Sequence, residues 1–250
     1  DGARHYRVWT AVPDKAPPAA GYPVLYMLDG NAVMDKLDDA FLQQLFAGSP
    51  PVIVAIGYQT ALPFDTAARA WDYTPPLKTH EPRAGKPALP PRKTGGNDVF
   101  RQLLTETMVP QTEANLKIDP HQRAIWGHSY GGLFVLDAWR KASPFGIYYS
   151  ASPSLGQALQ SPLQASQSLD AVRFRGKSLY LLEGDGKARG EPSGHEASLE
   201  VLRQTQQQLA SKGLTVAFWR YPGLTHGQMF EVSLRSALLH LSGQAALAHQ

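Results

Sequence analysis

Short apolar runs rich in β-branched and aromatic residues alternate along the chain with longer stretches in which apolar residues recur every three or four positions. The short runs have the composition of buried parallel strands, and the longer stretches are typical of amphipathic helices. The expected strands are 24–28, 52–56, 124–126, 146–151, 178–182 and 216–221. The expected helices are 34–47, 99–115, 131–141, 195–212 and 228–241. This alternation predicts an α/β fold with a doubly wound, mostly parallel sheet.

The length of 250 residues, with 43% apolar and 18% charged residues, suits a single globular domain over residues 1–250. A further strand is expected over 4–12. The segment 73–96 breaks the pattern, because its many prolines prevent a regular element. Its basic residues are Lys78, Arg83, Lys86, Arg92 and Lys93, against the single acid Glu81. This segment is either a solvated surface loop or a basic lip of the active site.

The chain contains no cysteine, which excludes thiol catalysis, disulfides and cysteine-based zinc sites. A formal net charge of +3 is too small to indicate nucleic-acid binding. No apolar run reaches the roughly 18 residues that span a bilayer, so we expect no membrane insertion. The polar first residues differ from a signal peptide, and we expect such a peptide to have been removed already.

The pentapeptide from Gly127 to Gly131 reads Gly-His-Ser-Tyr-Gly and matches the G-x-S-x-G nucleophile elbow. It follows an expected strand and opens an expected helix, which is the context that this elbow requires. A sharp turn there exposes the serine hydroxyl, and the flanking glycines let neighbouring backbone pass without a Cβ clash. We therefore expect Ser129 to be the nucleophile. His128 is interpreted as a packing residue whose side chain points elsewhere on the turn.

The catalytic histidine of such a fold follows the last strand and precedes the last helix. His226 occupies that position, in the turn-rich loop between the expected strand 216–221 and helix 228–241. The other histidines lie at element ends or in loops without a partner motif. We expect His226 to be the general base. No H-E-x-x-H occurs, and neither a metal nor another cofactor is expected.

The acid that orients the histidine is expected in the loop after strand 178–182, which reads Glu-Gly-Asp-Gly-Lys from Glu183 to Lys187. Many α/β-hydrolases carry the acid three residues after a glycine, but Lys187 stands there and cannot accept the imidazole N–H. Asp185 is the first candidate, and Glu183 and Glu191 are weaker ones. A serine–histidine dyad is the alternative, with a backbone carbonyl or a water orienting the ring.

Two backbone amides are expected to form the oxyanion hole. The first is the N–H of Tyr130, directly after the nucleophile and at the start of a helix. The second comes from the early Asp29-Gly30-Asn31 turn, in which the N–H of Asn31 or Gly30 points at the ester oxygen. On spacing alone, this second turn is equally an ordinary strand-ending turn.

Four blocks that span nearly the whole chain carry a family resemblance. They are PVLYMLDGNAVMDKLDD from Pro23, RAWDYTPP from Arg69, IWGHSYGGLF from Ile125 and YPGLTHGQMF from Tyr221. Together they resemble the siderophore esterases of the esterase D group. The similarity is strongest to the periplasmic trilactone esterases that act on enterobactin and related catecholate siderophores.

This resemblance implies an α/β-hydrolase fold and hydrolysis of the ester bonds of a cyclic catecholoyl-serine trimer, iron-loaded or iron-free. It implies catalytic roles for Ser129 and His226, a periplasmic location, and a dyad like that of some periplasmic members. It places Arg69 near an anionic catecholate, although a salt bridge to Asp72 is the simpler reading. A ferric tris-catecholate is a trianion, which the basic segment would attract.

Two other functions are compatible with these residues. One is a general carboxylesterase or S-formylglutathione hydrolase-like esterase, which shares the elbow and differs in its pocket. The other is a non-catalytic siderophore-binding protein on the same scaffold. The sequence does not indicate an oligomeric state.

Overall fold

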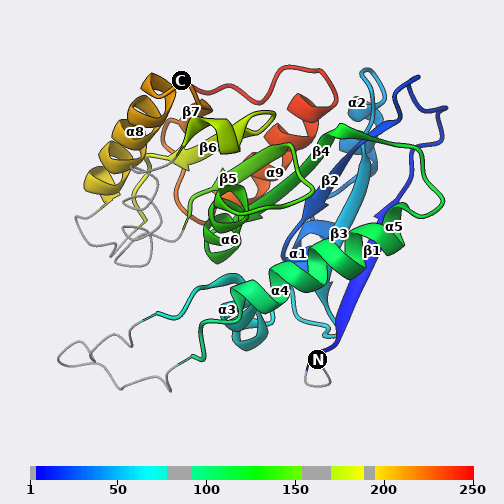
Figure 1. Ribbon diagram of the computed structural model, residues 1–250, viewed down its shortest axis with the longest axis horizontal. Helices are drawn as coiled ribbons and strands as arrows, with labels where there is room; N and C mark the ends of the chain where they lie inside the picture. The colour runs from blue at the N-terminus through cyan, green and yellow to red at the C-terminus, as the bar shows by residue number, and fades with distance from the viewer. Residues whose placement is uncertain (1–3, 78–91, 154–169, 189–194) are drawn as a thin grey trace.

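The computed structural model describes residues 4–77, 92–153, 170–188 and 195–250. They form a seven-stranded sheet with the strand order β1-β3-β2-β4-β5-β6-β7 (Figure 1). Strand β1 runs antiparallel to β3, and the other neighbouring strands run parallel. The strands are β1 (Tyr6–Ala11), β2 (Tyr22–Met27), β3 (Val52–Tyr58), β4 (Ile118–His128), β5 (Ile147–Ala151), β6 (Ser178–Gly184) and β7 (Thr215–Tyr221). The predicted α/β fold with a mostly parallel sheet is confirmed.

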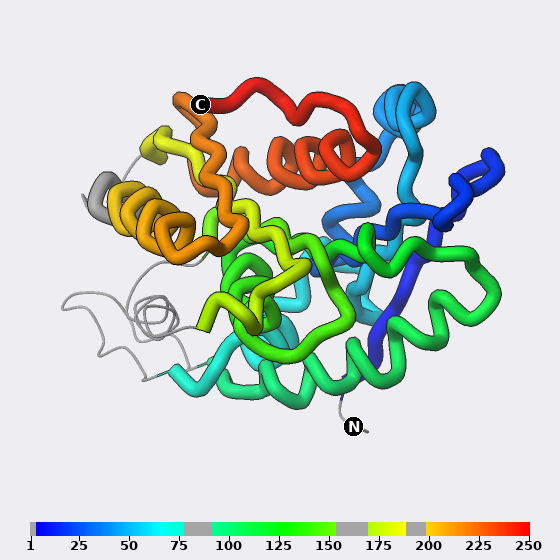
Figure 2. The backbone as a smooth tube through the Cα atoms, turned by 45° about the horizontal axis from the view of Figure 1, so that its top comes forward, coloured from blue at the N-terminus to red at the C-terminus, as the bar shows by residue number. Residues whose placement is uncertain are grey.

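Helices cover both faces of this sheet, and apolar residues that alternate along a strand enter two separate clusters. Val24 and Tyr26 of β2 pack in one cluster, and Leu25 and Met27 pack in the other. Figure 2 shows helix α9 and the segment from α4 to α5 on opposite sides of the sheet. The helices are α1 (Gly30–Met34), α2 (Asp39–Leu45), α3 (Thr66–Tyr73), α4 (Asn97–Leu103), η1 (Leu104–Met108), α5 (Val109–Glu113), α6 (Tyr130–Arg140), η2 (Ala171–Phe174), α8 (His195–Ser211) and α9 (Met229–Leu241). Burial on both faces explains why the strands read as continuous apolar runs.

The helices differ from the sequence prediction in several places. The helix expected over 34–47 is two short helices, because Asp38 caps α2 by accepting a hydrogen bond from the N–H of Phe41 at 2.7 Å. Helix α3 was not predicted. It begins after Asp65, whose carboxylate accepts a hydrogen bond from the N–H of Ala68 at 3.0 Å. The segment expected over 99–115 is helical from Asn97 to Glu113, with a π-helical turn at η1.

Helix α3 is fastened to the edge of the sheet by the fully buried carboxylate of Asp72. The hydroxyls of Tyr6 in β1 and Tyr58 in β3 donate to Asp72 Oδ2 at 2.8 and 2.7 Å. The Nε of Arg4 lies 2.9 Å from Asp72 Oδ1. A buried charge is tolerated only when it is paired and hydrogen-bonded, and this carboxylate meets both conditions. The contacts hold α3 where strand β3 ends.

Candidate active site

The carboxyl ends of β2 and β4 are neighbours in the sheet, so the turns that follow them lie side by side. The N–H of Leu28, directly after β2, donates to the carbonyl of Trp126, near the end of β4, at 3.1 Å. The turn after β4 carries Ser129, and the turn after β2 carries Asp29 and Asn31. Ligands of open α/β sheets bind at the carboxyl ends of the strands, and this edge is therefore the candidate site.

The backbone of Ser129 has φ 60° and ψ −118°, an unusual conformation for a residue with a side chain. Its N–H donates to the carbonyl of Ala151 at 2.9 Å. A Cβ on Gly127 would come within 2.3 Å of the carbonyl oxygen of Gly131, and a Cβ on Gly132 within 2.6 Å of that of Ala151. The two glycines therefore permit a turn too tight for side chains, which presents the serine hydroxyl at the edge of the sheet.

The structure brings Ser129 and His226 together. His226 lies in the loop between β7 and α9, and its Nε2 is 3.1 Å from Ser129 Oγ. This distance is within hydrogen-bond reach for a nucleophile and its general base. The pair joins residues 97 positions apart in the chain, as the order of elements had predicted.

The loop after β6 holds the loop that carries His226. The N–H of Gly186 donates to the carbonyl of Leu224 at 2.8 Å, and the N–H of Gly223 donates to Asp185 Oδ1 at 2.5 Å. A Cβ on Gly184 would come within 2.2 Å of the Leu224 carbonyl, so only glycine allows the two loops to lie this close. These contacts therefore help to position the loop that carries His226.

The structure does not bring Asp185 to the imidazole of His226. Besides the N–H of Gly223, its carboxylate faces Arg220, whose Nε lies 3.4 Å from Oδ2. These contacts do not support the expected role of Asp185 as the orienting acid. They arise because the residue faces the turn at the end of β7, which the sequence does not reveal. Glu191, a weaker candidate, lies outside the described residues.

Glu183, the other weaker candidate, is buried at the end of β6 with a relative exposure of 1%. Its Oε1 accepts hydrogen bonds from the hydroxyl of Ser152 at 2.7 Å and from the N–H of Gly184 at 3.0 Å. Ser152 follows β5 and has a φ of 38°. Glu183 therefore braces the ends of β5 and β6, directly behind the two loops of the site.

His128 contributes to the site in a way that the sequence analysis missed. Its ring is buried, as expected of a packing residue, but Nε2 lies 2.8 Å from the backbone carbonyl of His226. Burial and the neighbouring His226 lower the pKa of His128 to about 3, so the ring is neutral at physiological pH. Since a carbonyl only accepts, Nε2 carries the proton and donates it. The strand alternation that puts His128 on the same face as Trp126, toward α9, was the available signal.

Arg69 forms a two-pronged ion pair with Asp29, with Nε 2.8 Å from Oδ1 and NH2 2.9 Å from Oδ2. The alternative interpretation, a salt bridge from Arg69 to Asp72, is wrong because Asp72 faces β1 and β3. The guanidinium carbon also lies 5.5 Å from the centre of the ring of Tyr130, which follows Ser129 in the chain. Arg69 therefore borders the site, as expected, while its charge is matched by a buried carboxylate.

Tyr130 and Asn31 each stand in the first turn of a helix that starts at this edge. Asn31 fastens α1 to the end of β3, because its Oδ1 accepts from the N–H of Tyr58 at 2.9 Å and its Nδ2 donates to the carbonyl of Tyr58 at 3.0 Å. Asp29 Oδ2 lies 3.7 Å from a Cβ built on Gly131, so the starts of α1 and α6 are adjacent. Amides of the first helical turn have no partner within the helix and suit a developing negative charge.

The basic segment predicted over 73–96 is described only in part. Residues 78–91 lie outside the described ranges, and Arg92 and Lys93 are exposed at the end of that gap. Among the described residues, no group of three His, Cys, Asp or Glu side chains is arranged to hold a metal ion. In the same part of the chain, no helix combines the length and apolar character needed to cross a membrane.

Residues 3–241 match the family model described as "Putative esterase". The chain belongs to this esterase family. It is 49% identical over 247 residues to the apo-salmochelin esterase of Escherichia coli, covering 98% of this chain and 77% of that protein. It is 36% identical to the ferri-bacillibactin esterase BesA of Bacillus subtilis, covering 96% and 86%. The solved structure of the enterobactin hydrolase IroE in complex with DFP superposes with a TM-score of 0.86 at 48% identity, covering 97% and 91%.

These similarities confirm the enzyme class and the fold expected from the sequence. The chain is a carboxylic ester hydrolase with the α/β-hydrolase fold. The match extends over nearly the whole chain, so the strands and loops that carry Ser129 and His226 lie within the region compared.

The hydrogen bond from His128 to the His226 carbonyl generates a prediction. His128→Phe keeps an aromatic ring at this position and removes the hydrogen-bond donor, so the imidazole of His226 should be displaced. We expect kcat for a chromogenic aryl ester to fall by about 10-fold to 100-fold while KM changes little. His128→Gln, whose side-chain amide can reach the same carbonyl, should restore kcat to within about threefold. Equal kcat values for the two variants, at matched melting temperatures, would show that the donor is irrelevant.

The Asp185→Asn variant tests whether Asp185 orients the imidazole of His226 or only contacts the loop that carries it. Asparagine keeps an oxygen acceptor for the N–H of Gly223, and kcat should stay within about threefold of the wild type. An acid that orients the histidine of a triad contributes about 10⁴-fold to kcat. A loss approaching that size in steady-state hydrolysis of the same aryl ester, with an unchanged melting temperature, would restore Asp185 to the catalytic group.

Proposed function

We propose that this esterase uses Ser129 as its nucleophile and His226 as its general base. The observation that carries the proposal is the 3.1 Å contact between Ser129 Oγ and His226 Nε2 at a strained elbow. Ser129 Oγ attacks the ester carbonyl carbon while Nε2 takes its proton and then passes it to the leaving alcohol. Water, deprotonated by the same nitrogen, attacks the acyl carbon of the acyl-serine; the bond to Ser129 Oγ breaks, Nε2 returns the proton to Oγ, and the acid is released. The N–H groups of Tyr130 and Asn31 receive the oxyanion in both steps.

Two hydrogen bonds to backbone carbonyls help to position the base in this mechanism. His128 donates to the carbonyl of His226, and Gly186 donates to the carbonyl of Leu224 two residues earlier. The carboxylate of Asp185 is engaged by Gly223 and Arg220, so the proposed mechanism gives Asp185 no part in orienting the imidazole.

The proposed substrate is a catecholate siderophore of the enterobactin type, a cyclic triester of catecholoyl-serine. The support comes from the relatives, which are named as esterases or hydrolases of salmochelin, bacillibactin and enterobactin. Hydrolysis would open the trilactone and weaken its hold on iron. Arg69, beside the nucleophile, is the proposed contact for an anionic catecholate ring, and the substrate is proposed to be accepted with or without iron. The proposed location is the periplasm.

The central prediction of this proposal concerns Ser129. Ser129→Ala should lower kcat/KM for a catecholate trilactone by more than about 10³-fold, because the covalent route is lost. Ser211→Ala, in an exposed part of α8, is the matched control and should retain wild-type turnover. Mass analysis of the products measures both variants.

The same assay separates the alternatives. Trilactone hydrolysis by Ser129→Ala within tenfold of the wild type would refute the nucleophile. A strong preference of the wild type for a small acyl ester over the trilactone would indicate a general carboxylesterase instead. Recovery of unchanged trilactone in a stoichiometric complex would indicate a binding protein.

A further inference from the structure

A cleft of about 750 Å³ lies beside helix α3, and neither Ser129 nor His226 lines it. It is bordered by Tyr58 at the end of β3 and by Arg4, just before β1. Strand β3 is separated from β4, which leads to Ser129, by β2 alone. With neighbouring strands about 4.8 Å apart, the end of β3 that borders the cleft lies roughly 10 Å from the elbow, at the same edge of the sheet. The volume of the cleft is that of a typical small-molecule site.

Basic side chains dominate the charge of this cleft. Arg4, Arg92 and Lys93 line it together with His5, whereas Asp65 is the acid among the lining residues. The charge of Arg4 is matched by Asp72, and that of Asp65 is partly offset by the N–H of Ala68. Neither Arg92 nor Lys93 forms an ion pair with any residue of the described ranges. Both are exposed, and they add positive charge that an anion would neutralise.

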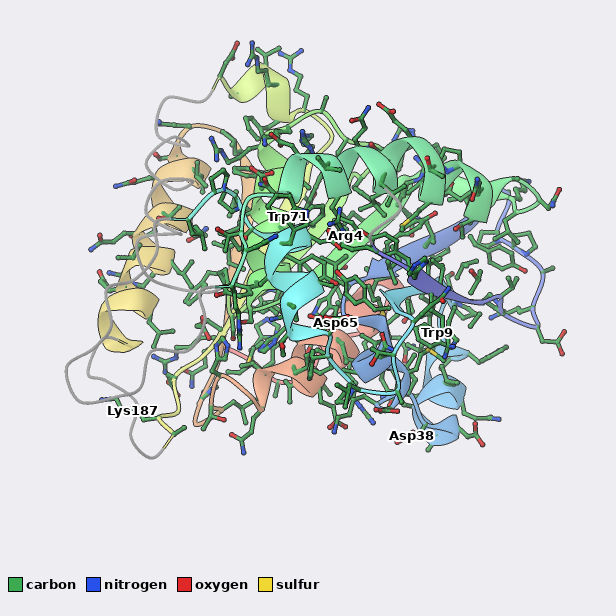
Figure 3. The ribbon with its side chains drawn as sticks, turned by 90° about the horizontal axis from the view of Figure 1, so that it is seen from below. Arg4, Trp9, Asp38, Asp65, Trp71 and Lys187 are labelled. Carbon is green, nitrogen blue, oxygen red and sulfur yellow. The ribbon has the colours of Figure 1, made fainter. Side chains whose placement is uncertain are left out.

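Two planar side-chain groups, an indole and a guanidinium, also line the cleft. Trp71 of α3 lines it, and the guanidinium of Arg4 lies over the indole, with its carbon 5.9 Å from the ring centre. Figure 3 shows Arg4 and Trp71 together beside α3, with Asp65 at the start of that helix. Indole and guanidinium planes both stack on aromatic rings. Positive charge beside such planes suits a ring that carries a negative charge.

We propose that this cleft is a second binding site, which takes an anionic aromatic ring of the benzoate or catecholate type. Ring stacking on Trp71 and Arg4 supplies the shape selection, and Arg92 and Lys93 supply the charge selection. If the proposed function holds, the ring is one arm of the trilactone, held in the cleft while Ser129 attacks an ester bond on the same edge of the sheet. The cleft then acts on substrate affinity and leaves the chemical step unchanged.

The binding test uses 2,3-dihydroxybenzoate, the isolated ring with a carboxylate, in calorimetric titration of the whole protein at low ionic strength. We expect saturable binding that Arg92→Gln/Lys93→Gln weakens at least fivefold. The control Arg173→Gln/Arg175→Gln removes the same charge from exposed positions at η2 that do not line the cleft. It should change the affinity less than twofold. The uncharged 2,3-dihydroxybenzamide and the non-aromatic cyclohexanecarboxylate should each bind at least fivefold more weakly.

Absence of saturable binding, or equal weakening by the two double variants, would overturn the site, since the effect would then be one of net charge alone. Because all four substituted side chains are exposed, folding should be unaffected, and equal melting temperatures verify this.

With the trilactone as substrate, Arg92→Gln/Lys93→Gln should raise KM about fivefold with kcat within twofold. If the wild type binds the ring but does not hydrolyse the trilactone, the proposed function is refuted and the proposal of a second binding site still holds. Trilactone hydrolysis without ring binding would refute the second binding site and leave the proposed function standing.

Discussion

The left-handed backbone at Ser129 is the constraint on which the rest of the site depends. A conformation of this kind costs about 1–3 kcal/mol and persists only where the surroundings impose it. Here the hydrogen bond from its N–H to Ala151 and the close approach of Gly127 to Gly131 impose it. Because β4 ends and α6 begins at this one residue, the hydroxyl projects from the sheet and the N–H of Tyr130 heads a helix. The proposed nucleophile and the proposed oxyanion donor thus come from a single strained turn.

The turn at Ser129 faces the loop that carries His226, and backbone groups of a neighbouring loop hold that loop in place. The loop after β6 is hydrogen-bonded to the loop that carries His226, and the neutral ring of His128 holds the His226 carbonyl from the elbow side. His128 and Ser129 are adjacent in the chain, so the elbow positions both the Ser129 hydroxyl and the main chain of His226. A shift of the elbow would therefore displace both members of the pair.

The sequence was sufficient for the features that depend on local order. Strands buried on both faces leave continuous apolar runs, and the elbow and the late histidine are tied to fixed places in the order of elements. Side-chain pairing was harder to predict. Arg69 and Asp72 are three residues apart on one helix, a spacing at which side chains are neighbours, yet Asp72 is taken by two tyrosines and Arg69 reaches Asp29. Side-chain pairing of this kind depends on which strands lie next to the helix. The same holds for the cleft, which is lined by Arg4 and Arg92 although they are far apart in the sequence.

If the elbow and the loop of His226 together make Ser129 reactive, diisopropyl fluorophosphate should label Ser129 rapidly. The measurement is the rate of covalent labelling in the wild type and in His226→Ala, with the modified residue located by mass spectrometry. We expect one label per chain, on Ser129, and labelling slowed by more than about 100-fold without the imidazole. Labelling at another residue, or at an unchanged rate in His226→Ala, would contradict this expectation.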